Sequence, residues 1–585
     1  MRAPAKPATR TAVRPSLAGA EAALKARLDR WAAGGRGPLL AALVVLLAGL
    51  PGLVAMPPLD RDESRFAQAT AQMLETGDFV NIRMQDEARD KKPVGIHWLQ
   101  AASVSVASSV ERREIWAYRI PSILGAMLAA AACAWGAAAF LGARGGLAAG
   151  AILGATMLLS TEGFIAKTDA VQCGAITLAM AALARIYYAG RGGPPAGART
   201  KAWFWIGMAL AILVKGPVGP MVAVLTIAAL WIADRRCEWL PRLGWTWGLT
   251  LIAAVAGPWA VAITVATDGG FWGQAIGGDL APKLVGGHES HWGWPGYHLA
   301  AAPLLFFPAA LILPAALAYG WRRRREPFAR FALAWLVPAW LVFEAMPTKL
   351  VHYPLPVYAA LAWLAAGALT EPVGPISRRL GAGLSLLGGV AFAAVCVWAA
   401  AEYGGTAAGL WAGPAAALVL AAGVAGALGL MRRGPGVGLA AAGVLGVLGH
   451  MVAAGGLAPA LDDLWLTHRA AKALAAAGLD PRNGVTPGPV AVAGYSEPSL
   501  VFSLGTATQL GGAEQAVQAV EEGRPALVEK TLSEPFRQAL ARQGAKAAPA
   551  GVVEGYDYSN GDPAALELWR SLAPPTASIS APRLP

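Results

Sequence analysis

The sequence predicts a polytopic α-helical membrane protein with about thirteen transmembrane helices, surface helices in the first outer loop and a small C-terminal α/β domain. Three observations support this fold class. Hydrophobic residues make up 56% of the 585 positions and charged residues only 14%, which is more apolar than a soluble domain. Apolar runs of roughly 20 residues, the length that spans a bilayer, recur along the chain. Basic residues cluster between alternate runs, as they do in cytoplasmic loops.

The predicted spans lie near residues 38–57, 115–141, 145–162, 170–189, 202–214, 217–233, 245–266, 298–319, 328–345, 354–370, 381–400, 407–430 and 437–455. The basic clusters that mark the cytoplasmic side are Arg144, Arg191 with Arg199 and Lys201, Arg235 with Arg236 and Arg242, Arg322 to Arg325, Arg378 with Arg379, and Arg432 with Arg433. The net charge of +12 therefore reflects topology, and we expect membrane lipids rather than nucleic acid as partners.

The ends of the chain differ from its apolar centre. Residues 1–37 form a basic cytoplasmic arm, and the first apolar run reads as an uncleaved span because many further spans follow it. Residues 38–455 form the transmembrane domain, which includes an outer loop at 58–114. Strand-like segments at 490–493 and 526–528 and a helix-like segment at 534–543 predict an outer α/β domain over 456–573. Residues 574–585 are expected to be disordered.

The stretch 202–233 decides the topology downstream. Its two flanks are basic, and Lys215-Gly216-Pro217 interrupts it midway, so we expect two short helices that turn at Lys215. Two readings of this lysine remain open. Its side chain faces protein or water at the outer surface, or it reaches from the bilayer to the interface as a snorkelling residue.

The loop 58–114 is rich in charge. It contains Asp60-Arg61-Asp62-Glu63-Ser64-Arg65 and Arg89-Asp90-Lys91-Lys92-Pro93. In a helix from about 60 to 75, Asp62 and Arg65 share a face, so that a carboxylate and a guanidinium can converge. A second helix should begin at Pro93 and carry His97. A dense charge run taken alone is usually a solvated loop.

Position changes that weighing, because the other outer connections are short and carry isolated polar groups. These groups are Lys167, Asp169, Lys215, Lys283, His288, Glu289, His291, Lys349, His352 and Tyr353. Together with the first loop they could surround one cavity, where cations hold phosphate and a carboxylate orients or deprotonates an acceptor.

An ordered set of motifs then resembles a known family. The motifs are Asp62-Glu63-Ser64-Arg65-Phe66-Ala67, Gly77-Asp78-Phe79, Lys92-Pro93 with Trp98, Lys167-Thr168-Asp169-Ala170, Lys215-Gly216-Pro217, and Lys349-Leu350-Val351-His352-Tyr353-Pro354-Leu355-Pro356. The sequence resembles the lipid-linked-sugar glycosyltransferases of the C superfamily, most of all the aminoarabinose transferases of lipid A and the protein O-mannosyltransferases (glycosyltransferase family 39-like). The resemblance covers about 38–370 and the outer C-terminal domain.

The resemblance implies an inverting transfer of a sugar from a polyprenyl-phosphate donor to lipid A or another envelope glycolipid, in a multi-pass protein of the bacterial inner membrane with its site and C-terminal domain in the periplasm. It implies Asp62 and Asp169 as the catalytic acidic residues. The groups that would bind the donor phosphate or an anionic acceptor are Arg65, Lys92, Lys215, Lys349, His352 and Tyr353. Asp60, Glu63 and His97 are reserve candidates.

One departure from the family concerns metal binding. Relatives often have an acidic residue before the Lys-Pro motif, where this chain has Lys91. His288, Glu289 and His291 could replace that ligand, but such a run in a loop is more often polar surface, and we expect no metal site. The four cysteines form no CxxC pair. Two other functions remain as alternatives: a transporter or flippase of a lipid-linked sugar, and a noncatalytic glycolipid-binding scaffold.

Overall fold

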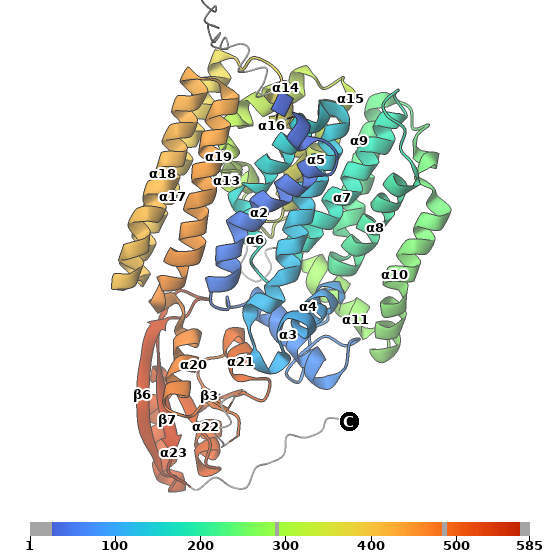
Figure 1. Ribbon diagram of the computed structural model, residues 1–585. Helices are drawn as coiled ribbons and strands as arrows, with labels where there is room; N and C mark the ends of the chain where they lie inside the picture. The colour runs from blue at the N-terminus through green and yellow to red at the C-terminus, as the bar shows by residue number, and fades with distance from the viewer. Residues whose placement is uncertain (1–25, 28, 287–291, 482–487, 574–585) are drawn as a thin grey trace, which may run out of the picture.

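The computed structural model describes residues 26–27, 29–286, 292–481 and 488–573. A long helical bundle occupies most of the chain, and a sheet domain lies beyond one end of it (Figure 1). The principal helices of the bundle are α2 (Arg36–Ala55), α5 (Ile115–Gly154), α6 (Met157–Glu162), α7 (Thr168–Ala189), α8 (Ala198–Lys215), α9 (Val218–Asp234), α10 (Trp245–Ala266), α13 (Tyr297–Leu305), α14 (Leu313–Arg322), α15 (Pro327–Ala345), α16 (Tyr358–Ala368), α17 (Pro375–Tyr403), α18 (Thr406–Arg432) and α19 (Pro435–Val452).

The predicted spans all fall on helices, but not all of these helices are long enough to cross a bilayer by themselves. Among the described residues, eight helices are long and apolar enough, or nine if α13 and α14, which are bent by 115°, form one broken span. Helix α9 and the segment Leu355–Ala368 are shorter and apolar. The polytopic helical fold is therefore confirmed, while the count of thirteen spans stays a prediction.

Two predicted breaks are found in the bundle. Helix α5 reverses at Gly142, whose φ of 73° suits glycine, and its two arms pack antiparallel because Gly146 and Gly150 lie against the backbones of Ala134 and Ala130. The second arm ends at Gly154, so the predicted run 145–162 is not one helix but this arm followed by α6. Helix α8 ends at Lys215 and α9 begins at Val218, as the Lys-Gly-Pro interruption predicts.

Helix α7 is the centre of the bundle. Other helices enclose it over almost its whole length, in particular α5 and α8. Small side chains permit this close packing: Gly174 of α7 lies so near Gly125 of α5 that a Cβ at Gly174 would be 2.4 Å from the Gly125 carbonyl oxygen. The first turn of α7, which carries Asp169, is thereby held in one place.

The first outer loop folds against this end of the bundle. It contains α3 (Asp62–Thr76), a two-stranded hairpin of β1 (Arg83–Met84) and β2 (Glu87–Ala88), α4 (Gly95–Ala107) and the 3-10 turn η1 (Val110–Arg112). Helix α3 is the predicted helix at 60–75, and α4 begins two residues after Pro93. Further along the chain, the connection after α10 contains α11 (Gly270–Trp272), a π-helical segment (Gly273–Leu280) and α12 (Ala281–Val285).

The C-terminal region forms a five-stranded sheet in the order β4-β3-β5-β7-β6. The strands are β3 (Ala491–Ala493), β4 (Gln509–Gly511), β5 (Ala526–Glu529), β6 (Ala547–Tyr556) and β7 (Pro563–Ser571), and the helices are α20 (Leu466–Ala476), α21 (Pro498–Leu504), α22 (Ala513–Glu521) and α23 (Ser533–Gln543). Strand β3 pairs in parallel with β4 and β5, whereas β7 is antiparallel to its neighbours. The strands expected at 490–493 and 526–528 and the helix at 534–543 are present; the hairpin of β6 and β7 was not predicted. The expected disordered tail 574–585 lies outside the described residues, as does most of the basic arm.

Candidate active site

Asp62 begins helix α3 and is the most accessible carboxylate of the predicted site. Its side chain is 46% exposed, and its ion pair is with Arg89, at 3.7 Å between Nη2 and Oδ1. Burial raises the pKa of this carboxyl, but the charges of Lys92 and Arg89 outweigh that effect and hold the pKa at about 2. Asp62 is therefore ionised at neutral pH. The helical spacing predicted Arg65 as its partner, and the structure corrects this to Arg89, which the β1–β2 hairpin brings back to α3.

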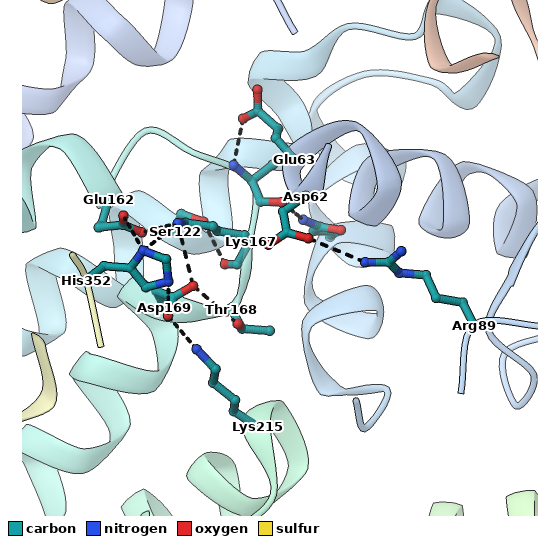
Figure 2. Close-up of polar contacts among 12 residues, drawn as sticks. Asp62, Glu63, Arg89, Ser122, Glu162, Lys167, Thr168, Asp169, Lys215 and His352 are labelled. Carbon is teal, nitrogen blue, oxygen red and sulfur yellow. Dashed lines mark hydrogen bonds and ion pairs between the residues drawn. The ribbon is translucent and has the colours of Figure 1, made fainter. Parts of the chain in front are cut away.

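Asp169 lies in the first turn of α7 and is nearly buried. Its Oδ1 accepts a hydrogen bond from the Lys215 ammonium at 2.5 Å and lies 3.5 Å from His352 Nε2 (Figure 2). The structure thus brings together three predicted site residues from three separate segments: the start of α7, the turn between α8 and α9, and the loop before α16.

Two further charged residues complete this cluster. Lys167 Nζ lies 3.0 Å from Glu162 Oε2 and 3.8 Å from Asp169 Oδ2, and His352 Nδ1 lies 3.7 Å from Glu162 Oε1 (Figure 2). Glu162 was missed as a site residue, because it ends an apolar run and matches no motif. A lone carboxylate in such a run is itself a signal, since an ionisable group within a membrane segment needs a partner.

Glu63, the neighbour of Asp62, has a different role. Its carboxylate is fully buried and accepts hydrogen bonds from Arg119 Nε at 2.8 Å and Nη2 at 2.7 Å. It also accepts from the backbone N–H groups of Leu59 and Ala166, at 2.8 Å and 2.7 Å. All its acceptor sites are engaged, so Glu63 fixes α3 to α5 and to the segment before α7. Arg119, an arginine within an apolar span, was also missed by sequence reasoning.

Two cations of the first loop, Lys92 near Asp62 and Arg65 near Asp60, have hydrogen-bond donors to spare. The Lys92 ammonium lies 5.3 Å from the centre of the Phe66 ring, and burial lowers its pKa to about 8 even though Asp62 raises it. Neither Lys92 nor Arg65 forms a hydrogen bond or ion pair through its side chain within the described ranges. Tyr353 lies beside this group, with its ring centre 5.9 Å from the Lys215 ammonium. These cations can therefore bind an anion.

Three predicted residues form their hydrogen bonds with partners outside the cluster. The Lys349 ammonium donates to the carbonyls of Glu344 at 2.6 Å and Met346 at 2.5 Å, so it caps the end of α15, a placement that does not support phosphate binding. Asp60 accepts a hydrogen bond from the backbone N–H of Ser499 in the C-terminal domain. His97 is buried between α3 and α4, 2.9 Å from the Thr70 hydroxyl, and burial lowers its pKa to about 3, so its ring is neutral.

The described residues contain no group of three or more His, Cys, Asp or Glu side chains suited to a metal ion. The alternative ligands His288, Glu289 and His291 lie outside those residues. The arrangement at Asp62 and Asp169 is thus one of carboxylates among lysines, which can orient hydroxyl or amino groups and neutralise a phosphate.

The chain is similar in sequence to known glycosyltransferases. Residues 91–261 match the model of the dolichyl-phosphate-mannose-protein mannosyltransferase family. An undecaprenyl phosphate-alpha-4-amino-4-deoxy-L-arabinose arabinosyl transferase of Aeromonas salmonicida is 28% identical over 349 residues, which cover 59% of this chain and 60% of the relative. The transferase of the same description from Aeromonas hydrophila is 27% identical over 321 residues, 53% of this chain and 56% of the relative. The chain thus spans about 60% of the length of these curated relatives.

The fold is similar to that of a solved structure over nearly all of both chains. ArnT from Cupriavidus metallidurans bound to undecaprenyl phosphate has a TM-score of 0.71 at 21% identity, with 92% of this chain and 99% of that chain covered. The apo form of the same protein gives a TM-score of 0.69 at 20% identity. The chain is therefore a multi-pass helical membrane protein. In sequence, the chain is thus similar to dolichyl-phosphate-mannose-protein mannosyltransferases over residues 91–261 and to arabinosyl transferases over somewhat more than half of its length, and in fold it is similar to ArnT.

Proposed function

We propose that this chain is an inverting glycosyltransferase that moves a sugar from a polyprenyl-phosphate donor to lipid A or another envelope glycolipid on the periplasmic side of the inner membrane. The observation that carries the proposal is the juxtaposition of an accessible, ionised Asp62 with Lys92 and Arg89 and with the Asp169–Lys215 pair. The resemblance in sequence to arabinosyl transferases agrees with it.

The reaction breaks the bond between the anomeric carbon of the sugar and a phosphate oxygen of the donor. The bonding pair leaves with the polyprenyl phosphate, and an oxygen of the acceptor attacks the anomeric carbon from the opposite face. Negative charge grows on the phosphate as this bond breaks, so Lys92, Lys215 and Arg65 stabilise the transition state more than the ground state. His352 lies beside Asp169, and the Tyr353 ring lies beside Lys215.

The role of Asp62 depends on the acceptor. A lipid phosphate is already a nucleophile, and Asp62 then orients sugar hydroxyl or amino groups. A hydroxyl acceptor gives up a proton during attack, and Asp62, ionised at neutral pH, is placed to receive it. In either case Asp169, whose carboxylate is bonded to Lys215, is the second acidic residue of the site. Donor and acceptor are both lipids, so the site must be reachable from the bilayer.

Product analysis tests the proposal directly. Purified protein in nanodiscs is given polyprenyl-phosphate sugars that carry aminoarabinose, galacturonic acid or mannose, with lipid A as acceptor, and the products are identified by mass spectrometry. We expect transfer from one donor and release of polyprenyl phosphate in equal amount. Folded protein that transfers none of these sugars contradicts the proposal.

We also propose that the 58–114 loop and the 456–573 domain face the periplasm, because both lie at one end of the helical bundle and the basic residues between α14 and α15 lie at the other (Figure 1). Reporter fusions after residues 110, 285 and 480 should be active only outside, and fusions after 195 and 325 should report the cytoplasm. A cytoplasmic signal at 285 would mean that 202–233 crosses the membrane once, and would contradict this orientation.

A further inference from the structure

Helix α3, which carries Asp62, is held from outside by the C-terminal domain at its beginning. The Asp60 carboxylate accepts a hydrogen bond from the Ser499 N–H at 3.0 Å, where α21 starts. The Arg61 guanidinium donates to the carbonyl of Ser559 at 2.7 Å. The two residues immediately before Asp62 are therefore both bonded to the C-terminal domain.

A second attachment lies further along α3 and centres on one hydroxyl. Thr506 Oγ1 donates to Glu75 Oε2 at 2.6 Å and accepts from Gln68 Nε2 at 2.7 Å. It also accepts from Arg113 Nη2 at 3.1 Å, and the Thr506 carbonyl accepts from Gln85 Nε2 at 3.1 Å. A single residue of the C-terminal domain thus contacts α3, the hairpin that follows it and the end of the loop.

Apolar packing between these attachments closes the contact. Phe502 of α21 is fully buried against Ala67 and Ala71 of α3, and its ring centre lies 5.2 Å from that of Tyr118. The opposite face of α3 packs through Phe66 and Met73 on the membrane bundle. Helix α3 is therefore clamped between the bundle and the C-terminal domain.

The clamp matters because Asp62 is not fixed by its own contacts. Its ion pair with Arg89 is long, 3.7 Å, and nearly half of its side chain is exposed. The position of its carboxylate relative to Asp169 and Lys215 follows from the setting of α3. We infer that Thr506 is a positioning residue, through which the C-terminal domain fixes α3 and hence Asp62 for transfer. This inference rests on the proposed function.

The test compares isosteric and conservative changes of Thr506. Thr506→Val keeps the shape but removes the hydroxyl, and we expect kcat to fall about tenfold, because small misplacements of reacting groups are costly. The KM for the donor and the Kd for undecaprenyl phosphate should stay at their wild-type values. Thr506→Ser, which retains the hydroxyl, should restore kcat. Thr508→Val is the matched control, because among the described residues that hydroxyl donates only to the Gly505 carbonyl of its own loop.

A second readout does not depend on activity. Hydrogen–deuterium exchange should become faster in peptides from α3 (Asp62–Thr76) in Thr506→Val and should not change in α7. If wild-type protein transfers no sugar, the proposed function fails, and exchange in α3 alone decides this inference. If Thr506→Val does not fold, Arg61→Met, which removes the exposed bond to Ser559, carries the same measurements.

Three results would overturn the inference. The first is a wild-type kcat and unchanged α3 exchange in Thr506→Val. The second is an equal loss in Thr508→Val or in Thr506→Ser, which would indicate a general effect of the loop. The third is weaker donor binding that accounts for the whole loss, which would place Thr506 at the donor rather than behind Asp62.

Discussion

Each end of helix α7 carries a cluster of charged side chains, and the two clusters differ in how completely their charges are paired. Near Ala189, Asp234 is almost buried and accepts from Arg191, Arg330 and the Tyr187 hydroxyl. Near Thr168, Asp169 and Glu162 share Lys167, Lys215 and His352, while Asp62 and the Lys92 ammonium lie nearby.

This difference indicates which cluster stabilises the fold and which one could bind a substrate. At Asp234 of α9, both carboxylate oxygens are engaged by Tyr187 of α7, by Arg191 just after α7 and by Arg330 of α15, so the cluster joins three helices and leaves neither oxygen free for a ligand. Near Asp169, the Lys92 ammonium forms no hydrogen bond or ion pair within the described part of the chain, so it can bind an anionic substrate. The same contrast holds between Glu63, which is saturated, and Asp62, which is not.

The largest effect should come from a change in the fully paired cluster around Asp234. Asp234→Asn leaves Arg191 and Arg330 without their carboxylate, and removal of one partner from a buried ion pair typically costs about 3–5 kcal/mol. We expect a large loss of folded protein, measured by size-exclusion yield and thermal midpoint. The protein that does fold should transfer sugar at the normal rate per molecule, because Asp234 is at the far end of α7 from Asp169. A selective loss of turnover with normal stability would contradict the comparison.

Removal of a cation from the incompletely paired cluster around Asp62 and Asp169 should affect ligand binding instead of folding. Lys92→Ala should weaken undecaprenyl phosphate by about 1.5–3 kcal/mol, the usual range for a charged hydrogen bond. The uncharged alcohol undecaprenol is the control ligand, and its affinity should not change. Isothermal titration in nanodiscs measures both. Equal weakening of both lipids would mean that Lys92 contacts something other than the phosphate.

The activity that depends on the cluster around Asp62 and Asp169 should also change with pH, because the charge of Lys92 does. Its pKa is lowered to about 8, so the ammonium is present below that pH and is lost as pH rises through it. We expect kcat/KM, which reports on the free enzyme, to fall above about pH 8. Lys92→Arg, whose charge persists, should move this limb to higher pH. A limb that stays in place in Lys92→Arg would assign it to another group.

The smallest effect should come from Asp60, which faces the Glu497 and Asp557 carboxyls and the Arg65 charge. Burial raises the pKa of Asp60 from 3.8 to about 6, although its hydrogen bonds with Ser499 lower it. The docked loop therefore holds this proton more tightly than a free loop, and docking is favoured at low pH and weakens as pH rises from about 4 to 6. Asp60→Asn should reduce the pH dependence of exchange in α3 and leave transfer at neutral pH nearly normal. Unchanged pH dependence would contradict the assignment.

Sequence patterns predicted the elements of this molecule better than their contacts. Apolar length and basic clusters predicted the helices, and the Lys-Gly-Pro interruption predicted the turn at Lys215, because these are local properties of the chain. The motifs placed Asp169, Lys215 and His352 in one site, and the structure brings them together. Lys349 is bonded instead to the end of α15, and Asp60 is bonded to the C-terminal domain. Neither contact is marked by a local sequence pattern.

Sugar transfer by Asp62→Asn, measured together with donor binding, tests most directly whether Asp62 is the catalytic carboxylate. The change removes one negative charge at nearly constant volume from a residue that is 46% exposed. We expect kcat to fall by about 10²–10⁴-fold, the range for a positioned acid or base, while polyprenyl-phosphate binding and thermal stability are retained. Near-normal transfer by Asp62→Asn, with loss of transfer in Asp60→Asn, would rule out Asp62 as the catalytic carboxylate and move the reaction centre two residues towards the N-terminus.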